Sequence, residues 1–372
     1  MIATLALIAG LLLAFANGAN DNFKGVATLY GSAAASYRRA LIWATLATAM
    51  GSICAVWLAS ELLAKFSGKG IVTEQLTSQG EFGVAVALGA AVTVLFASRL
   101  GFPISTTHAL VGAMVGAAAA SKTLVHWNVL GAQVLAPLLL SPLVAILGTA
   151  VLYSFFHRAR IGLGVQRETC LCAGQQVVAT VPVTCSTPVA IQADALTVSL
   201  GTEVSCRERY AGNLVGIEMG QTIDSLHFVS AGLVSFARGL NDTPKIAALL
   251  LIVPIFSVTS SIAACGVAIA LGGVICGRRI AETLSQKITV LNPGQGFAAN
   301  VVTSLLAVSA SRWGLPVSTT HVSCGALFGV GMITGGAHRQ MIAQIVMAWI
   351  TTLPFAALMA AIVYLLTQTM SS

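Results

Sequence analysis

Long runs of uncharged, mostly apolar residues constrain this chain more than any other feature of its sequence. A helix needs about 20 apolar residues to span the hydrocarbon core of a bilayer, and several of the runs reach that length. Only 8% of the 372 residues are charged, against roughly 25% in soluble domains. The sequence therefore predicts an all-α polytopic membrane protein and excludes a soluble enzyme, a disordered chain and an ordinary nucleic-acid-binding protein. The runs cover residues 2–20, 40–60, 82–98, 100–121, 123–156, 246–277, 295–311 and 340–372.

Two motifs occur twice, in the same order along the chain. The segment 15–21 recurs at 236–242, 221 positions later, and both copies end in Asn-Asp. The segment 98–108 recurs at 311–321, 213 positions later, and both copies end in Ser-Thr-Thr-His. A repeat of this kind predicts two membrane halves built on one plan. We place the two halves and the polar loop between them at residues 1–156, 227–372 and 157–226.

Pairs of arginines indicate how the halves are oriented. Arg38 and Arg39 precede the apolar segment 40–60 in the first half, whereas Arg278 and Arg279 follow the equivalent segment in the second. Because cytoplasmic loops carry an excess of Lys and Arg, equivalent loops should lie on opposite sides of the membrane, which is an inverted-topology repeat. Each half then crosses an odd number of times, with five segments per half and about 10–12 in all, including broken helices or re-entrant hairpins. Both termini are expected outside and the polar loop in the cytoplasm.

The polar loop 157–226 differs in composition from the rest of the chain. It contains several arginines, and residues 177–202 are rich in Val and Thr, which predicts a few short strands. Thiolates bind zinc, but the spacing of the cysteines matches no standard ligand pattern, and a disulfide conflicts with a cytoplasmic loop. A metal site, a disulfide and thiols without a special role remain open, and the last is the simplest. The loop cysteines are Cys170, Cys172, Cys185 and Cys206.

Asp21 and Asp242 occupy equivalent positions of the repeat, and each follows an asparagine, Asn20 or Asn241, at the end of an apolar run. A carboxylate at membrane depth is costly and indicates a functional site. The same pattern also suits a helix break followed by an N-cap. Capping accounts for one aspartate but not for two symmetric copies, and both roles are compatible because transporters expose backbone at broken helices.

Lys24 and Lys245 lie three residues after the two aspartates. Residues three apart share one face of a helix, so each half is predicted to hold an Asp–Lys pair. Such a pair supplies either a coupling-ion site or a counter-charge beside a bound anion. The alternative is a lysine at a helix end whose ammonium group reaches the membrane surface.

The Ser-Thr-Thr triplets follow Pro103 and Pro316, which we expect in the first turn of a helix. The free amides of a helix N-terminus form an anion site, and the hydroxyl groups add further donors at the same place. Ser and Thr also serve helix packing in membranes, but two copies in symmetric register favour function. The predicted anion ligands are Ser105, Thr106, Thr107, Ser318, Thr319 and Thr320.

Two further pairs of polar residues correspond in the repeat. His108 and His321 follow the triplets directly, and either anion contact, proton transfer or a structural hydrogen bond suits them. Gln133 and Gln344 lie in the last segment of each half. They are accessory candidates for the site, with interhelical hydrogen bonding as the alternative.

Together these residues resemble the inorganic phosphate transporter (PiT) family, some of whose members carry sulfate. The resemblance rests on Gly18-Ala19-Asn20-Asp21 and on Gly101–His108, each present twice, and covers both halves but not the loop 157–226. It implies an inverted-repeat secondary transporter, commonly dimeric, that moves phosphate with a cation by alternating access. It also implies that the duplicated Asn-Asp and Ser-Thr-Thr residues hold phosphate and the coupling ions.

The chain departs from the family pattern directly after each aspartate. Family members typically continue with Val-Ala-Asn, whereas this chain has Asn22-Phe23-Lys24 and Thr243-Pro244-Lys245. An ammonium group in place of an amide could replace a bound Na⁺ as the local positive charge. We therefore hypothesise that sodium coupling is weakened or replaced by protons.

The leading interpretation is a secondary transporter of inorganic phosphate in the cell membrane, driven by Na⁺ or H⁺, with no other cofactor and no metal centre. A proton-coupled sulfate permease of the same fold is the alternative, followed by an anion channel and an intramembrane enzyme using Ser105, His108 and Asp21. Paired carboxylates argue against a channel, and two intact copies of every motif argue against an enzyme, which needs one nucleophile. The expected partners are phosphate or sulfate, the coupling cation, the lipid bilayer and a second copy of the chain. No nucleic acid is expected.

Overall fold

A computed structural model of the chain describes residues 2–66, 68, 70–181, 189–210, 215–251 and 256–371. The chain divides into two compact units, which are described separately. The membrane unit comprises Met1–Tyr153 and Phe228–Ser372, and the loop unit comprises Ser154–His227. Cys185 lies outside the described residues.

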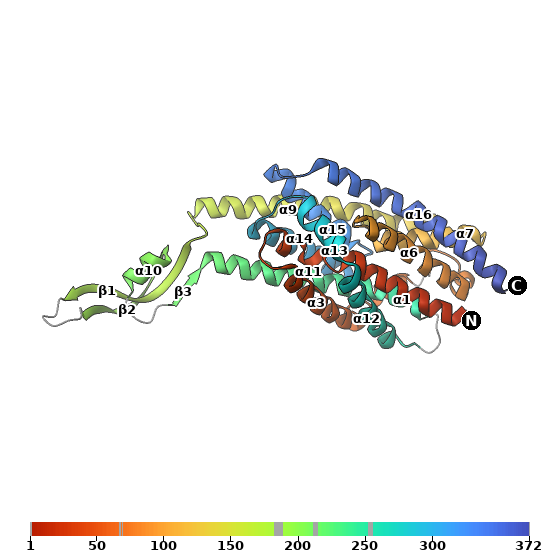
Figure 1. Ribbon diagram of the computed structural model, residues 1–372, viewed down its shortest axis with the longest axis horizontal. Helices are drawn as coiled ribbons and strands as arrows, with labels where there is room; N and C mark the ends of the chain where they lie inside the picture. The colour runs from red at the N-terminus through yellow and green to blue at the C-terminus, as the bar shows by residue number, and fades with distance from the viewer. Residues whose placement is uncertain are drawn as a thin grey trace. The chain divides into compact units, whose positions relative to one another are not determined.

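Long helices make up most of both halves of the membrane unit (Figure 1). Short helical turns connect the longer helices. The first half contains α1 (Ile2–Asp21), η1 (Lys24–Val26), α2 (Ala27–Gly31), α3 (Tyr37–Leu58), α4 (Ser60–Phe66), α5 (Glu74–Thr77), α6 (Gly80–Leu100), α7 (Thr106–Ala120), α8 (Trp127–Val129), η2 (Leu130–Leu135) and α9 (Ala136–Gly162), which extends into the loop unit. The second half contains α11 (Met219–Leu250), which begins in the loop unit, α12 (Val258–Cys276), α13 (Arg278–Glu282), η3 (Thr283–Lys287), α14 (Pro293–Arg312), α15 (Thr319–Thr334) and α16 (Arg339–Ser371).

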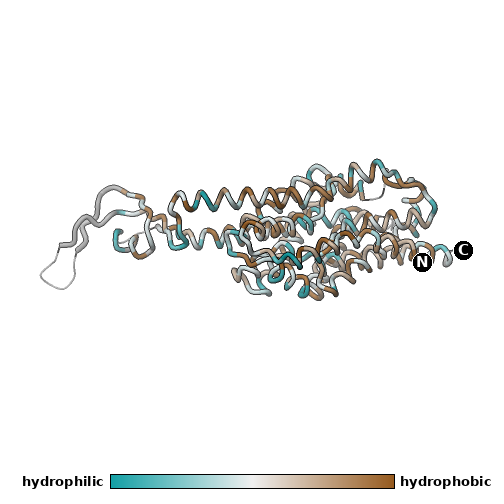
Figure 2. Tube along the Cα trace, turned by 90° about the horizontal axis from the view of Figure 1, so that it is seen from above, coloured by the Kyte–Doolittle hydropathy of each residue, from teal (hydrophilic) through white to brown (hydrophobic). Residues whose placement is uncertain are grey.

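The helices are long and apolar enough to cross a membrane. Within the described residues, six stretches meet both criteria: Ile2–Gly31, Tyr37–Leu58, Gly80–Leu100, Trp127–Gly162, Val258–Cys276 and Arg339–Thr369. Many large apolar side chains are exposed. Figure 2 shows that hydrophobic residues extend along the helices. On α3, for example, Ile42, Leu46, Met50, Ile53 and Trp57 are each more than half exposed. Lipid accounts for this exposure, so the prediction of a helical polytopic membrane protein is confirmed.

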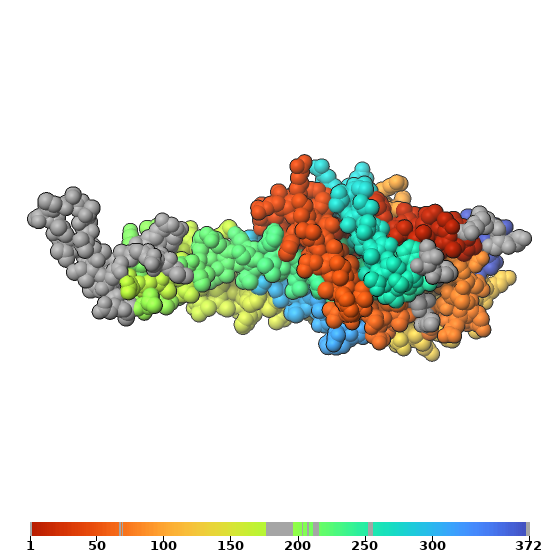
Figure 3. Space-filling view, turned by 90° about the horizontal axis from the view of Figure 1, so that it is seen from below, coloured from red at the N-terminus to blue at the C-terminus, as the bar shows by residue number. Residues whose placement is uncertain are grey.

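Glycines let the first helix of each half pack closely on the second helix of the other half. A Cβ atom added at Gly18 on α1 would lie 1.9 Å from the carbonyl oxygen of Ile269 on α12, and one at Gly272 would lie 1.9 Å from that of Phe15. The equivalent glycines, Gly239 on α11 and Gly51 on α3, approach backbone just as closely. Small residues permit such contacts between membrane helices. Figure 3 shows α1 beside α12 on one face of the unit.

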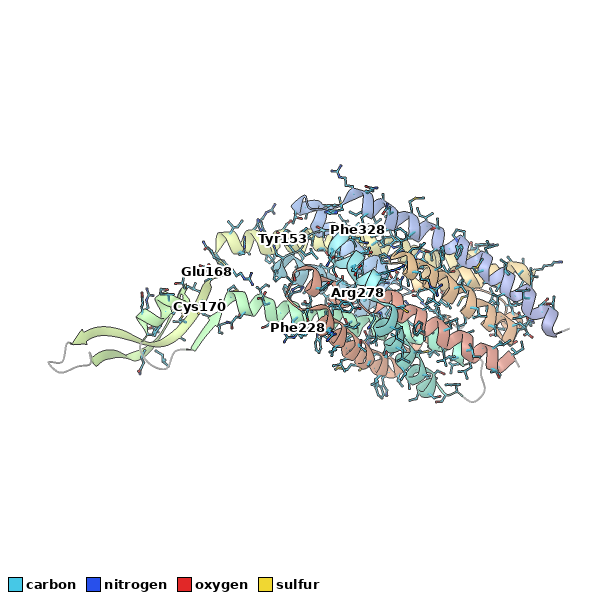
Figure 4. All side chains as sticks on the ribbon, in the orientation of Figure 1. Tyr153, Glu168, Cys170, Phe228, Arg278 and Phe328 are labelled. Carbon is cyan, nitrogen blue, oxygen red and sulfur yellow. A yellow bond between two sulfur atoms is a disulfide. The ribbon has the colours of Figure 1, made fainter. Side chains whose placement is uncertain are left out.

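The ends of the membrane unit bear on the number of crossings. Helix α1 begins and α16 ends at the same end of the unit, whereas Tyr153 and Phe228, where the chain leaves and returns, lie toward the other end (Figures 1 and 4). A half that crosses the membrane an odd number of times begins and ends on opposite sides, and these positions agree with that expectation. The inverted relation of the halves and the side of the membrane on which each end lies remain predictions.

The loop unit contains a small antiparallel sheet of order β2-β1-β3, with strands β1 (Thr169–Val181), β2 (Val189–Thr202) and β3 (Val215–Glu218), and helix α10 (Glu203–Arg209). Cys170, labelled in Figure 4, and Cys172 are buried two residues apart on β1. They pack with Cys206 of α10 and with Tyr210. Cys172 and Cys206 form a disulfide, which is the alternative that the sequence analysis disfavoured. Side chains two residues apart lie on the same face of a strand, so Cys170 and Cys172 share one face of β1. Helix α10 places Cys206 against that face.

The disulfide leads to a first prediction. Protein isolated without reductant should yield, after digestion, a peptide pair linked through Cys172 and Cys206, and Cys206→Ser should abolish it. Because a disulfide typically contributes about 2–4 kcal/mol, Cys206→Ser should also make the loop unit more sensitive to protease. Cys276→Ser, which removes an exposed thiol from α12, is the control. Rapid alkylation of both Cys172 and Cys206 in unreduced native protein would contradict the pairing.

Candidate functional site

The first Asn-Asp pair lies at a break between helices, and the second does not. Helix α1 ends at Asp21 and η1 begins at Lys24, as the sequence predicted. In the second half α11 continues past Asp242 to Leu250 with Pro244 inside it, so the expectation of a break there is wrong. The repeat places Gly25 opposite Ile246. Helix propensity alone does not explain this difference, because glycine weakens a helix interior by about 1 kcal/mol and proline, which the unbroken helix contains, by about 3 kcal/mol.

The two Ser-Thr-Thr triplets begin helices α7 and α15. Ser105 and Ser318 are the N-caps, and their hydroxyl groups accept hydrogen bonds from the amides of His108 and His321 at 3.1 and 3.2 Å. Pro103 and Pro316 therefore lie two residues before the caps, and the prediction that they occupy the first helical turn is wrong. Serine in an extended conformation is a preferred N-cap, so the helix starts after it.

Both aspartates accept hydrogen bonds from the first threonine of the triplet in their own half. The Thr319 hydroxyl lies 3.1 Å from Asp242 Oδ2, and the Thr106 hydroxyl lies 3.4 Å from Asp21 Oδ2. The amide of Asn241 donates to Asp242 Oδ1 at 2.9 Å. Each carboxylate is thus held against the N-terminus of a helix from the same half.

The two asparagines connect these helices to the loops before the triplets. Asn20 donates to the carbonyl oxygen of Phe102 at 3.0 Å and accepts from the amide of Ile104 at 3.1 Å. Asn241 donates to the carbonyl oxygen of Val317 at 3.3 Å. These bonds fix the loop next to the carboxylate, so Asn20 and Asn241 are positioned to hold the site together.

Each lysine reaches from its own half into the other. Lys24 forms an ion pair with Asp21 and a hydrogen bond with the Thr320 hydroxyl. Lys245 Nζ lies 3.7 Å from Asp242 Oδ1 and donates to the Thr107 hydroxyl at 3.0 Å. The ammonium groups also donate to the carbonyl oxygens of the residues before the caps, Ile104 at 3.2 Å and Val317 at 2.8 Å.

The site is completely buried, and its contacts are reciprocal. None of the twelve Asn-Asp, lysine and Ser-Thr-Thr residues is more than 4% exposed. The carboxylate, carbonyl and hydroxyl oxygens around one ammonium group match those around the other in type and position. The structure therefore brings together, at the interface of the halves, Asn20, Asp21, Lys24, Ser105, Thr106, Thr107, Asn241, Asp242, Lys245, Ser318, Thr319 and Thr320.

The accessory candidates behave differently from one another. The rings of His108 and His321 are buried and meet with centroids 4.4 Å apart, and His321 also stacks on Trp349 at 3.9 Å. Gln133 and Gln344 are exposed instead, so they do not join the buried network. Both positions correspond in the sequence repeat, and both face outward from their helices.

Sequence reasoning missed the most connected side chain of the site, Arg238 on α11. Its guanidinium group donates to Asn17 Oδ1 at 2.8 Å and to Asn22 Oδ1 and Thr48 Oγ1, both at 3.1 Å. Asn17 in turn donates to Asp21 Oδ2 at 3.0 Å. The repeat carried a signal, because Arg238 aligns with the uncharged Asn17 within the duplicated motif.

Buried carboxylates, cations and hydroxyl groups at the interface of two halves, inside a unit that exposes apolar helices, define a membrane transporter rather than an enzyme. A family model described as "Phosphate transporter family" matches residues 17–360. The chain belongs to this phosphate transporter family.

Individual relatives agree with the family assignment. The chain is 29% identical over 393 residues to a Rhizobium meliloti protein named "Probable low-affinity inorganic phosphate transporter", covering 98% of each chain. A Mycobacterium bovis protein of the same name is 26% identical over 374 residues, which cover 97% of this chain and 76% of that protein. A solved structure described as "The sodium-dependent phosphate transporter" has the same fold, with a TM-score of 0.75, 22% identity and 99% of both chains covered.

The N-caps lead to a second prediction. Ser105→Ala should lower the stability of the protein by about 1 kcal/mol, because alanine cannot accept from the His108 amide, whereas Ser105→Gly should cost only a few tenths. Thermal unfolding in detergent measures the difference, and Ser318 variants should behave in the same way. Ser121→Ala, at the other end of α7, is the control. Equal unfolding temperatures for Ser105→Ala and Ser105→Gly would show that the cap is not the stabilising feature.

Proposed function

We propose that this chain carries inorganic phosphate across a membrane together with a cation, by alternating access between its two halves. Membership of the phosphate transporter family supports phosphate as the substrate. The sodium-dependent neighbour supports coupling to a cation. The observation that carries the proposal is the meeting of two Ser-Thr-Thr helix N-termini and two Asp–Lys pairs at one buried interface.

The chemistry of these groups suits a tetrahedral oxyanion. The first amides of α7 and α15 and the hydroxyls of Thr106, Thr107, Thr319 and Thr320 are donors that can bind phosphate oxygens. Asp21 and Asp242 are acceptors for phosphate O–H groups, which sulfate lacks at neutral pH. The lysines supply positive charge at a buried site. None of the relatives reported above names sulfate, so we retain phosphate as the substrate.

Coupling is proposed to depend on the lysines. Oxygen atoms from a carboxylate, a carbonyl group and a hydroxyl group surround each ammonium group, and unwound backbone carbonyls in transporters typically coordinate Na⁺. Lys24 and Lys245 would therefore occupy positions suited to a cation. We infer that Na⁺ contributes little and that protons drive uptake.

The remaining expectations concern the assembly and its location. Placement of the arginine pairs supports a multi-pass protein of the cell membrane with both termini outside and the loop unit in the cytoplasm. A homodimer follows from the family resemblance alone. No cofactor beyond the coupling cation is proposed.

The third prediction tests transport directly. Proteoliposomes should accumulate ³²P-phosphate under an inward proton gradient, and Asp21→Asn or Asp242→Asn should lower the rate at least about tenfold, the effect of 1.4 kcal/mol. The control is Asp224→Asn, which removes a partly exposed carboxylate of the loop unit. Absence of phosphate uptake under proton, sodium and no gradient would refute the proposed function.

The same vesicles separate the alternatives. Uptake that needs a Na⁺ gradient would refute the counter-charge role of the lysines and leave a sodium symporter. Accumulation of ³⁵S-sulfate without phosphate would mean the substrate is sulfate. Phosphate movement that never exceeds equilibrium under any gradient would indicate a channel.

A further inference from the structure

The residue four positions before each aspartate differs in charge between the two halves. Asn17 and Arg238 are equivalent in the repeat, and each lies four residues before an aspartate on the same helix. In the first half the Asn17 amide donates to Asp21 Oδ2 at 3.0 Å. In the second half Arg238 Nε faces Asp242 Oδ2 at 3.8 Å. A neutral group and a cation therefore occupy the same slot in the two halves.

The Arg238 guanidinium group is held firmly but is not neutralised. Its side chain is 1% exposed, and its two terminal nitrogens donate to amide and hydroxyl oxygens of the first half. Within the described part of the chain, Nε has no hydrogen-bond partner. A buried arginine usually forms a bidentate pair with one carboxylate. Here both neighbouring carboxylates are shared with a lysine: Asp21 pairs with Lys24, and Asp242 faces Lys245.

The charges at the interface do not balance. Lys24 and Lys245 each pair with one aspartate, and Arg238 is a third cation without a carboxylate of its own. The rings of His108 and His321 lie against each other, and the described residues give neither ring a carboxylate partner, so both are counted as neutral, as is the buried thiol of Cys324. The site without substrate therefore carries one net positive charge. A buried charge without a counter-charge is costly, so binding of one negative charge is favoured.

We propose that Arg238 determines the charge of the substrate, so that the site accepts a singly charged tetrahedral oxyanion, dihydrogen phosphate, in preference to a dianion. This inference rests on the proposed function and specifies which ionic form is carried. A monoanion neutralises the site, whereas a dianion leaves one net negative charge in a low-dielectric region. Dihydrogen phosphate also brings two O–H donors, one for each aspartate.

The experiment compares four proteins in proteoliposomes: the wild type, Arg238→Asn, Arg238→Lys and the double variant Asn17→Arg with Arg238→Asn. Arg238→Asn introduces the residue that the first half already has in this slot. The double variant moves the cation to the equivalent slot. The initial rate of ³²P-phosphate uptake is measured against concentration, with and without Na⁺, at one pH below and one pH above the second pKa of phosphate. Unlabelled sulfate is added as a competitor.

The wild type should give the same half-saturating concentration at both pH values when it is expressed as dihydrogen phosphate. For Arg238→Asn without Na⁺ this concentration should rise about tenfold or more, and Na⁺ should restore part of the loss by supplying the missing charge. Arg238→Lys and the double variant should keep the wild-type preference for dihydrogen phosphate and need no Na⁺ for it, whatever their maximal rates, because both keep the third cation. Sulfate should compete weakly wherever that cation is present.

Three results would overturn the inference. The first is a wild type that responds to total phosphate regardless of pH, and the second is Arg238→Asn with unchanged kinetics and no response to Na⁺. The third is Arg238→Lys and the double variant with the same rise in half-saturating concentration and the same response to Na⁺ as Arg238→Asn, because both keep the charge that Arg238→Asn removes. A wild type that takes up no phosphate under any condition is a separate outcome, which refutes the proposed function itself.

Discussion

The two buried aspartate–lysine pairs are the interaction on which the rest of the membrane unit depends. Removing charged groups from water costs several kcal/mol per ion, and only close pairing with additional hydrogen bonds offsets it. Asp21 and Asp242 meet this condition because threonines at the N-termini of α7 and α15 donate to them. The lysines meet it through carbonyl and hydroxyl oxygens, some of them from the opposite half. Neither half could bury its ions alone.

Close helix contacts allow each half to place hydrogen-bonding oxygens beside the lysine of the other half. In a bilayer, helices gain little from hydrophobic association, so association depends on close packing and interhelical hydrogen bonds. Gly18 and Gly239, which lie three residues before the two aspartates, are placed against backbone of α12 and α3. The glycines thus set the depth at which each Asn-Asp motif faces the other half. The close glycine contacts and the buried aspartates therefore lie on the same few turns of α1 and α11.

The local parts of the site could be predicted from the sequence, and the contacts between halves could not. Membrane helices, the two Asp–Lys pairs and the equivalence of the triplets follow from composition, i,i+3 spacing and repetition. The continuous helix through Asp242, the serine caps and the outward-facing Gln133 and Gln344 depend on backbone geometry that the motifs do not encode. In the sequence, Arg238 differs from its repeat equivalent Asn17, but nothing there indicates its contacts. The structure shows that oxygen atoms of the first half accept hydrogen bonds from it.

The hydrogen bonds of Thr320 suggest how substrate binding and motion are linked. Its hydroxyl donates to the carbonyl oxygen of Ile104 in the other half at 2.7 Å and interacts with Lys24. A hydroxyl group has one proton, so donating to a phosphate oxygen requires Thr320 to leave Ile104. In the proposed function, anion binding at this position would therefore replace a bond between the halves with a bond to the substrate. A ligand shifts a conformational equilibrium through contacts that differ between the two states, and this exchange of acceptors is such a difference.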